Sequence, residues 1–415
     1  MYIIRRAKIE DADTLLKLAK MVHFINLPPD KEIITEKILR SRDCFKHVGR
    51  GLPPQQKDSR RRSHGLRETM NESELFAFVV EDVETGAVLG SSQLVASMGG
   101  PGNPNVGFKI SERKFFSQSL HTGVTHMVAT LHLDESGPTE IGGLILQPAY
   151  RAHKAKLGRF LSFVRFHFIG LHRAHFADHV LAEMMAPLTS DGDNRFWDAL
   201  GRRFINLSYD EADRFCQYSR EFMFSLLPRE DIYLTLLAPQ ARQGVGQVGQ
   251  DTIPARKMLE KLGFEYRGVV DPFDGGPHLQ AATDDIPLVR ATRTVELGKP
   301  VAASSYKGLA ILSVLDGEGE FVAVQTPLAE RGGTVRIPRQ MMEALGVGIG
   351  DRVACTLIDP MPKLAEPGDN GAATSPERRR STKKPAAKKA TATKNNTKTR
   401  SRKTSKKPSR RKTTG

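Results

Sequence analysis

A single carboxylate interrupts an otherwise apolar, strand-like run of the chain. Glu183 is the one acidic residue in the segment His179–Met184. A carboxylate in this setting can act as a general base or bind the cationic end of a substrate, and a surface-facing position at a strand end is the alternative. The histidines show no spacing typical of metal ligands, so we expect no metal. The three cysteines, Cys44, Cys216 and Cys355, form no Cys-x-x-Cys pair, which favours small buried thiols in a reducing cytosol.

The excess of positive charge lies at one end of the chain. The formal net charge of the 415 residues is +15, yet residues 376–415 hold 17 Lys and Arg against one acidic residue, and the rest hold 45 against 46. Residues 363–415 contain no aromatic residue and are rich in Lys, Arg, Thr, Ser, Pro and Ala, so this basic tail is predicted to be disordered. Such tails bind DNA or RNA without sequence preference, and a tail that only improves solubility is the alternative.

Before residue 185, the chain alternates strand-like and helix-like patterns. Strands are predicted over Tyr2–Lys8, Leu75–Glu81, Ala87–Ala96, Gly143–Leu146 and His179–Met184. Helices are predicted over Glu10–Met21, which begins with acidic residues, and over the apolar run Leu157–Leu171. Residues 47–71 are polar, basic and rich in Gly and Pro, which predicts a flexible insertion.

Later segments suggest a repeat and a small C-terminal module. Asn194–Ile205 and Pro254–Tyr266 each predict a short helix, a Gly at its end and a Phe that begins a strand. We interpret them as a weak internal repeat, with chance similarity as the alternative. Residues Gly333–Leu357 predict strand, short helix, turn and strand, which resembles the swapped hairpins of AbrB-type DNA-binding proteins. We favour a small β module that caps the larger part of the chain.

The predicted order of strands and helices resembles that of the GNAT acyltransferases. In that fold, the turn from the fourth strand into the next helix binds the pyrophosphate of coenzyme A, because exposed backbone N–H groups and the helix dipole favour an anion there. The family pattern Arg-x-x-Gly-x-Gly is reduced here to Gly158, with Lys156 in place of the first Gly, and an ordinary basic helix start is the alternative. The resemblance implies coenzyme A contacts by the backbone or charge of Leu144, Ile145, Leu146, Arg151, Lys154, Lys156, Gly158 and Arg159.

A second set of segments is more specific than the turn into the helix. These segments are Phe176–Met184, Phe196–Phe204, Gly246–Val248, Thr252–Arg256, Leu259–Phe264 and Asp271–Pro277. They resemble arginine N-succinyltransferase, and the resemblance runs from about Leu75 to Arg290. This family transfers a succinyl group from succinyl-CoA to the α-amine of L-arginine in arginine catabolism. The resemblance implies succinyl-CoA as the acyl donor, and a backbone N–H within Leu144–Leu146 that stabilises the developing oxyanion.

One position departs from this family. Gly249 stands where the family carries a His proposed as the proton donor, so delivery of a proton to the leaving thiolate is unassigned. We name His278 as a substitute, provided that its loop folds back, and a histidine satisfied within its loop is the alternative. Glu183 remains the first candidate for the general base or for binding the cationic substrate, because the fold would direct it into the splay between strands where thioester and amine meet.

The sequence therefore predicts an α/β (α+β) GNAT acyltransferase fold. The predicted divisions are 1–209 for acyl-CoA binding, 210–300 for a second GNAT-like half that completes the site, 301–362 for the C-terminal β module and 363–415 for the disordered tail. We expect a cytoplasmic enzyme without a membrane span, and the sequence leaves open whether it forms an oligomer. The alternatives are a GNAT enzyme with another acyl donor or amine, and a non-catalytic scaffold that carries the basic tail.

Overall fold

The computed structural model describes residues 1–21, 28–55, 73–187, 194–216 and 218–361, which belong to one compact unit. The basic tail and most of the predicted insertion lie outside these residues, so their disorder and the nucleic-acid binding of the tail stay predictions. The insertion was placed too early, because residues 47–49 complete a helix. Among the described residues, no helix combines the length and apolar character that a membrane crossing requires.

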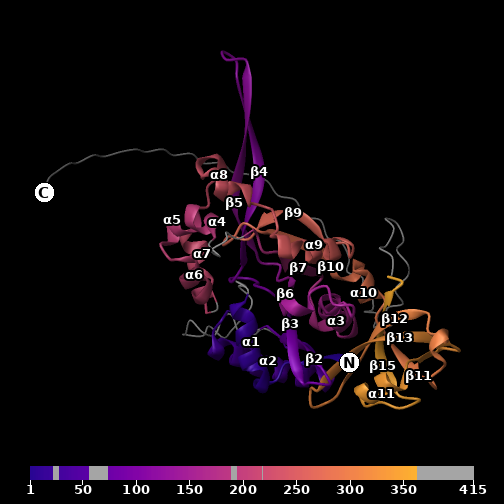
Figure 1. Cartoon of the computed structure of the whole chain (residues 1–415). Helices are drawn as coiled ribbons and strands as arrows, with labels where there is room; N and C mark the ends of the chain where they lie inside the picture. Colours follow the sequence, from indigo (N-terminus) through magenta and orange to yellow (C-terminus); the bar gives the residue numbers. More distant parts are fainter. Residues whose placement is uncertain (22–27, 56–72, 188–193, 217, 362–415) are drawn as a thin grey trace, which may run out of the picture. The chain divides into compact units, whose positions relative to one another are not determined.

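The described strands join in one mixed sheet (Figure 1). They are Tyr2–Arg6 (β1), Leu75–Asp82 (β2), Ala87–Val95 (β3), Asn105–Ser117 (β4), Thr122–Asp134 (β5), Thr139–Leu146 (β6), His179–Glu183 (β7), Ile232–Tyr233 (β8), Glu265–Val270 (β9), Pro277–Ala282 (β10), Arg293–Leu297 (β11), Gly308–Leu315 (β12), Phe321–Arg331 (β13), Thr334–Arg336 (β14) and Arg352–Asp359 (β15). Their order is β12-β15-β11-β14-β13-β1-β2-β3-β6-β7-β10-β9-β4-β5-β8. The sheet thus runs through the boundaries predicted at residues 209 and 300.

Helices cover both faces of the sheet around β2. The described α-helices are Ala12–Lys20 (α1), Lys31–Gly49 (α2), Leu157–Leu171 (α3), Arg195–Ala199 (α4), Gly201–Ile205 (α5), Tyr209–Cys216 (α6), Glu221–Leu226 (α7), Pro239–Gln243 (α8), Ile253–Glu260 (α9), Pro287–Arg290 (α10) and Arg339–Leu345 (α11). In β2, Ala77 and Val79 pack in the same cluster as α1 and the first half of α2, whereas Phe78 packs against Phe168 of α3. Because both faces are buried, β2 reads as an almost continuous apolar run.

The predicted elements are largely present, with informative exceptions. α3 has its predicted bounds because most of its side chains are buried and most of the buried ones are apolar. α2 and the pair β4 and β5 were not predicted. The proposed repeat is wrong in its first segment, since Phe204 lies inside α5 instead of beginning a strand. In the second segment, Gly263 ends the helical region with φ of +91° and β9 begins at Glu265.

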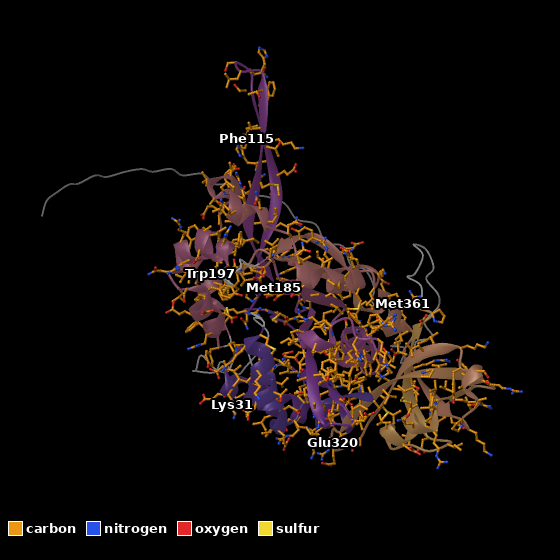
Figure 2. The ribbon with its side chains drawn as sticks, viewed as in Figure 1. Lys31, Phe115, Met185, Trp197, Glu320 and Met361 are labelled. Carbon is orange, nitrogen blue, oxygen red and sulfur yellow. The ribbon has the colours of Figure 1, made fainter. Side chains whose placement is uncertain are left out.

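β4 and β5 form a long antiparallel ribbon whose outer end extends beyond the neighbouring strands (Figure 1). Other strands pair only with the inner part of the ribbon. β9 pairs with β4 at Phe108 and Lys109, and β8 pairs with β5 at Val128 and Ala129. Phe115, on the outer half, is 49% exposed (Figure 2). Polar and exposed residues break the apolar alternation there, which explains why the ribbon was not predicted.

The C-terminal strands close into a five-stranded barrel. β12, β15, β11, β14 and β13 pair in that order, and β13 pairs with β12 to complete the ring. The interior is apolar, with Leu312, Val324, Val335 and Val353 among its buried residues. The barrel contains β11, so it begins before the predicted boundary at residue 301. β13 also pairs with β1, which joins the barrel to the rest of the sheet.

A buried polar network connects α3 to this barrel. The ring nitrogens of His167 share hydrogen bonds of 2.7 Å with the hydroxyls of Thr356 on β15 and Ser313 on β12. Burial lowers the pKa of His167 to about 3, so the ring is neutral at neutral pH and needs both partners.

We expect Ser313→Ala to lower the free energy of unfolding by about 1–3 kcal/mol, because it leaves a buried ring nitrogen without a partner. Urea unfolding of the purified protein measures this. Ser304→Ala, at an exposed position before β12, is the matched control and should change nothing. Equal stabilities of the two variants would contradict the role of the network.

Candidate active site

Glu183 and His278 lie opposite each other on neighbouring antiparallel strands. β7 ends at Glu183, and the register pairs this residue with His278 near the start of β10. The Nε2 atom of His278 lies 3.8 Å from Oε1 of Glu183 and 3.9 Å from Oδ2 of Asp271, distances that are long for hydrogen bonds but short for charge interactions. The side chains are only 4% and 11% exposed for His278 and Glu183. Neither the exposed strand-end carboxylate nor the loop histidine weighed from the sequence is present.

The neighbouring carboxylates control the charge of His278. Burial alone would lower the pKa of the imidazole, but the attraction of Asp271 and Glu183 outweighs burial and raises the pKa above its ordinary value. Nε2 makes no hydrogen bond with any described residue. The site therefore holds an imidazole that is protonated more readily than an ordinary histidine, and its Nε2 is available to another molecule.

The turn between β9 and β10 fixes two carboxylates beside this imidazole. Oδ1 of Asp271 accepts a hydrogen bond from the backbone N–H of Asp274, and Asp274 accepts one from the N–H of Ala186, at 3.1 and 2.8 Å. Burial, reinforced by the charge of Asp271, raises the pKa of Asp274 to about 7. A Cβ added at Gly276 would lie 1.9 Å from the carbonyl oxygen of Met184. Only glycine allows the turn to pack this closely against the end of β7.

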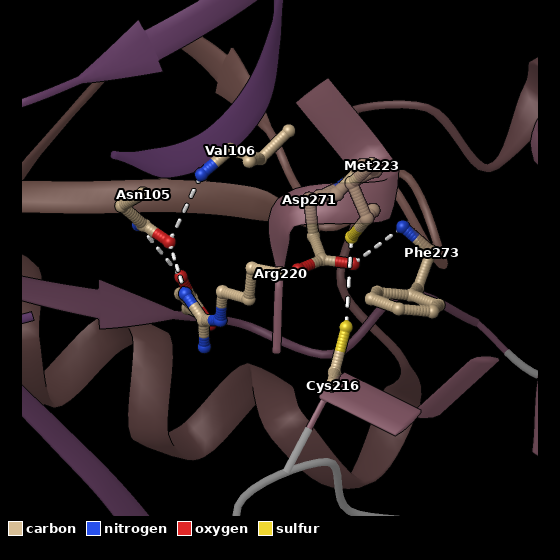
Figure 3. Close-up of a pocket in the computed structure, with 9 residues that line it drawn as sticks. Asn105, Val106, Cys216, Arg220, Met223, Asp271 and Phe273 are labelled. Carbon is tan, nitrogen blue, oxygen red and sulfur yellow. Dashed lines mark hydrogen bonds between the residues drawn. The ribbon is translucent and has the colours of Figure 1, made fainter. Parts of the chain in front are cut away.

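A pocket opens beside Glu183 (Figure 3). It is lined by Asn105, Val106, Glu183, Cys216, Arg220, Met223, Asp271, Pro272 and Phe273. Nδ2 of Asn105 donates a 3.1 Å hydrogen bond to Oε1 of Glu183, and Oδ1 of the same amide accepts one from Nη1 of Arg220. The side-chain amide of Asn105 thus bridges the carboxylate of Glu183 and the guanidinium of Arg220.

Glu183, Asp271 and His278 also have a spacing that suits a cation. One ligand atom from each lies within 4.8 Å of the other two. Positive charge is already supplied here by the imidazole and by Arg220, so the carboxylates are balanced without an ion. The absence of a metal stays a prediction.

A gap forms where β6 separates from β7. These parallel strands pair only at Thr139 with Val180 and Glu140 with Leu181, although β6 continues to Leu146. A bulge interrupts the pairing of β6 with β3, and Gly143 within it has φ of +57°. Backbone groups in the outer half of β6 are therefore not paired with β7. This is the position at which a thioester carbonyl could be bound by main-chain N–H groups.

The turn after β6 leads into α3, whose first N–H groups have no capping side chain. Lys156 precedes the helix with φ of +52° and makes no side-chain capping hydrogen bond, so the first N–H groups of α3 remain available to an anion. Arg159, in the first turn, has a buried Nε atom without a partner among the described residues. Arg151 pairs with Asp251 at 2.9 Å, which links this turn to the segment that follows Gly249.

The structure brings the predicted residues together in two groups. Glu183 and His278 form one, and the turn with Arg151, Lys156, Gly158 and Arg159 forms the other, with the end of β6 leading into it. Ile145 is buried in the core with α1 and α2, so only its backbone is available to a ligand. Leu144 and Leu146 are partly buried against the opposite core cluster.

Position 249 lies next to this site, but it carries no functional group. The N–H of Gly249 donates a 3.0 Å hydrogen bond to the carbonyl of Met185, just after β7. The imidazole of His278 reaches the end of β7 from β10 instead. The sequence interpretation required a loop that folds back to bring His278 to the site. The structure has no such loop, because His278 belongs to β10.

Three residues of the site were missed from the sequence. Asp271 begins the Asp271–Pro277 segment, whose similarity to a family was a usable signal. Asn105 and Arg220 are single polar residues in otherwise unremarkable segments. Asn105 lies 78 positions from Glu183, and nothing in the sequence pattern joins them.

The chain is similar in sequence and in structure to known proteins. The family model described as "Arginine N-succinyltransferase beta subunit" matches residues 2–288. The arginine N-succinyltransferase of Yersinia pestis (strain Pestoides F) is 37% identical over 289 residues, which cover 67% of this chain and 80% of that protein. The one from Photorhabdus laumondii is 32% identical over 286 residues, which cover 69% and 82%. The arginine/ornithine succinyltransferase subunit AI of Pseudomonas aeruginosa has a similar structure, with a TM-score of 0.67 at 27% identity over 86% of this chain and 98% of that one.

Proposed function

Because the chain belongs to the arginine N-succinyltransferase family, we propose that it transfers a succinyl group from succinyl-CoA to the α-amine of L-arginine. The observation that carries the proposal is the pairing of Glu183 with His278 at the end of β7, next to the gap between β6 and β7. In this proposal Glu183 acts as the base and His278, whose pKa is raised, as the acid, beside main-chain donors, which is what attack of an amine on a thioester requires.

Each group has a distinct role in the proposed reaction. Glu183 accepts a proton from the attacking amine, and N–H groups within Leu144–Leu146 stabilise the oxyanion of the tetrahedral intermediate. When the carbon–sulfur bond breaks, the imidazolium of His278 donates a proton to the departing thiolate. His278 thus takes the role of proton donor, which Gly249 cannot fill because it has no side chain.

Coenzyme A is held by the turn between β6 and α3 in this proposal. Its pyrophosphate binds the first N–H groups of α3, with Arg151, Lys156 and Arg159 as charge partners. The order of β1, α1, α2, β2, β3, β6, α3 and β7 and the separation of β6 from β7 support a GNAT-type fold. Residues 210–300 complete the site, since they supply Arg220, Asp271 and His278.

Release of free coenzyme A thiol tests the function. Purified protein is mixed with succinyl-CoA or acetyl-CoA and with L-arginine, L-ornithine or L-lysine. We expect thiol release that depends on both succinyl-CoA and L-arginine, accompanied by N-succinylarginine detected by mass spectrometry. Release with another donor or amine alone would point to a GNAT enzyme of different specificity. A folded protein that releases no thiol with any pair would contradict the proposal.

We expect Gly158→Ala to raise KM for succinyl-CoA about tenfold, equivalent to the loss of one good hydrogen bond of about 1.4 kcal/mol. The free protein has room for the methyl group, because an added Cβ meets only Leu146, at 3.9 Å. Thermal stability should therefore be unchanged, and the penalty should arise only when the pyrophosphate approaches the backbone.

Gly317→Ala is the matched control, since an added Cβ there meets nothing within 4 Å and the residue lies in the barrel. Steady-state kinetics at varied succinyl-CoA measure both variants. An unchanged KM in the Gly158 variant would remove this turn from the binding site.

A further inference from the structure

Arg220 is a cation in the pocket without an anionic partner of its own. Its guanidinium lies among the pocket-lining residues and donates from Nη1 to the neutral amide oxygen of Asn105 (Figure 3). Among the described residues, no carboxylate oxygen lies within ion-pair distance of it. Nearby carboxylates, first among them Glu183, outweigh the effect of burial and raise its pKa, so the charge persists at any relevant pH.

The distance between this cation and Glu183 is fixed by one side chain. Asn105 donates to Glu183 from its nitrogen and accepts from Arg220 at its oxygen, so both charged groups are hydrogen-bonded to the same side-chain amide. The oxygen of Asn105 also accepts a 3.1 Å hydrogen bond from the backbone N–H of Val106, which holds the amide in this orientation. The separation of base and guanidinium is therefore built into the base of β4.

An α-amino acid has the complementary arrangement of charges. Its amine and its carboxylate are attached to the same carbon, so an amine at Glu183 brings the carboxylate toward Arg220. The remaining wall of the pocket includes Val106, Met223 and Phe273, which suit the aliphatic part of a side chain. The α-carboxylate of such an acceptor thus meets the guanidinium of Arg220, while its α-amine lies at the carboxylate of Glu183.

We propose that Arg220 binds the α-carboxylate of the acceptor amino acid and so positions its α-amine at Glu183. The inference rests on the proposed function and deepens it, because it restricts the acceptor to free α-amino acids. Amines that lack the carboxylate, and amino acids whose carboxylate is blocked, are poor acceptors. Arg220 is a positioning residue, since it binds the substrate away from the reacting bond.

The test compares Arg220→Gln with the unaltered protein on two acceptors, L-arginine and L-argininamide, which differ only in the α-carboxylate. A charged hydrogen bond of about 1.5–3 kcal/mol corresponds to about 10- to 100-fold in affinity. We expect Arg220→Gln to lower kcat/KM for L-arginine by this factor, mainly through KM. For L-argininamide, which is already a poor acceptor, kcat/KM should change little, and Arg220→Lys should recover part of the loss. Arg214→Gln, at an exposed position on α6, should behave as the unaltered protein.

The carboxylate that Arg220 binds could belong to the acceptor amino acid or to the succinyl group, and a comparison of two acyl donors distinguishes them. Butyryl-CoA has the chain length of succinyl-CoA with a methyl group in place of the terminal carboxylate. If the loss in Arg220→Gln were confined to succinyl-CoA and equal for both acceptors, Arg220 would bind the acyl group, and the proposal would be overturned. An equal loss with every substrate pair would also overturn it, because it would indicate a structural role.

Failure of this inference can be told from failure of the proposed function. Calorimetric binding of L-arginine and L-argininamide needs no turnover and decides whether Arg220 binds the α-carboxylate. If the unaltered protein prefers L-arginine and the variant does not, the inference holds even for a protein without transfer activity. Equal affinities of the unaltered protein for the two ligands would overturn it.

Discussion

Glu183→Gln is expected to lower kcat for succinyl transfer at least about tenfold, because a general acid or base typically contributes about 10²- to 10⁴-fold. Glutamine keeps the size of the side chain and still accepts the hydrogen bond from Nδ2 of Asn105. It cannot take the proton of the attacking amine, so the chemical step slows while KM for both substrates stays close to its original value.

Steady-state kinetics with both substrates varied measure this split. Glu296→Gln, at an exposed position on β11 of the barrel, controls for the loss of one carboxylate. Unchanged kcat in the Glu183 variant would show that another group accepts the proton.

His278→Gln is expected to lower kcat by about 100-fold or more and to change the pH profile of the reaction. The neighbouring carboxylates raise the pKa of His278, so the unaltered enzyme retains its proton donor above the ordinary histidine pKa of about 6.5. Activity that depends on this proton declines as pH rises through the raised pKa. The variant should be slow at every pH and should lack that alkaline decline.

The pH dependence of the free energy of unfolding tests the raised pKa of His278 independently of activity. Since the pKa is higher in the folded protein than in the unfolded chain, the stabilisation is fully present below about pH 6.5 and is lost as pH rises through the folded pKa. The pH dependence of urea unfolding should therefore flatten in this range in His278→Gln. His121→Gln, at the exposed end of the ribbon, is the control. An identical alkaline decline in variant and unaltered enzyme would assign it to another group.

The parts of the fold that could be predicted are those whose pattern is local. α3 and the first six residues of β2 are mostly apolar because they are largely buried, and composition alone marks them. The outer ribbon of β4 and β5 is exposed, so no burial pattern distinguishes it from a loop. The closure of the barrel depends on the pairing of β12 with β13 and of β11 with β14, which has no signature within any one strand.

The same division applies to the site. Glu183 could be identified because a lone carboxylate in an apolar strand is costly unless it has a function or a partner. The place of His278 depends on the register between β7 and β10, strands almost a hundred positions apart, and a shift of one residue would turn the imidazole to the other face. Arg220 becomes meaningful only through Asn105, a contact between residues 115 positions apart.

The way the sheet ends determines where the protein is open to association with other chains. At one end, the strands roll into the barrel, and β12 pairs with both β15 and β13, so no strand there offers a long row of free backbone groups. At the other end, β8 covers β5 over only two residues. Unpaired backbone donors and acceptors are thus concentrated on the outer ribbon, where Glu112 and Lys114 place charges between the exposed aromatic side chains and the inner strands. Aggregation through added strands, if the protein is stressed, would begin at this ribbon and not at the barrel.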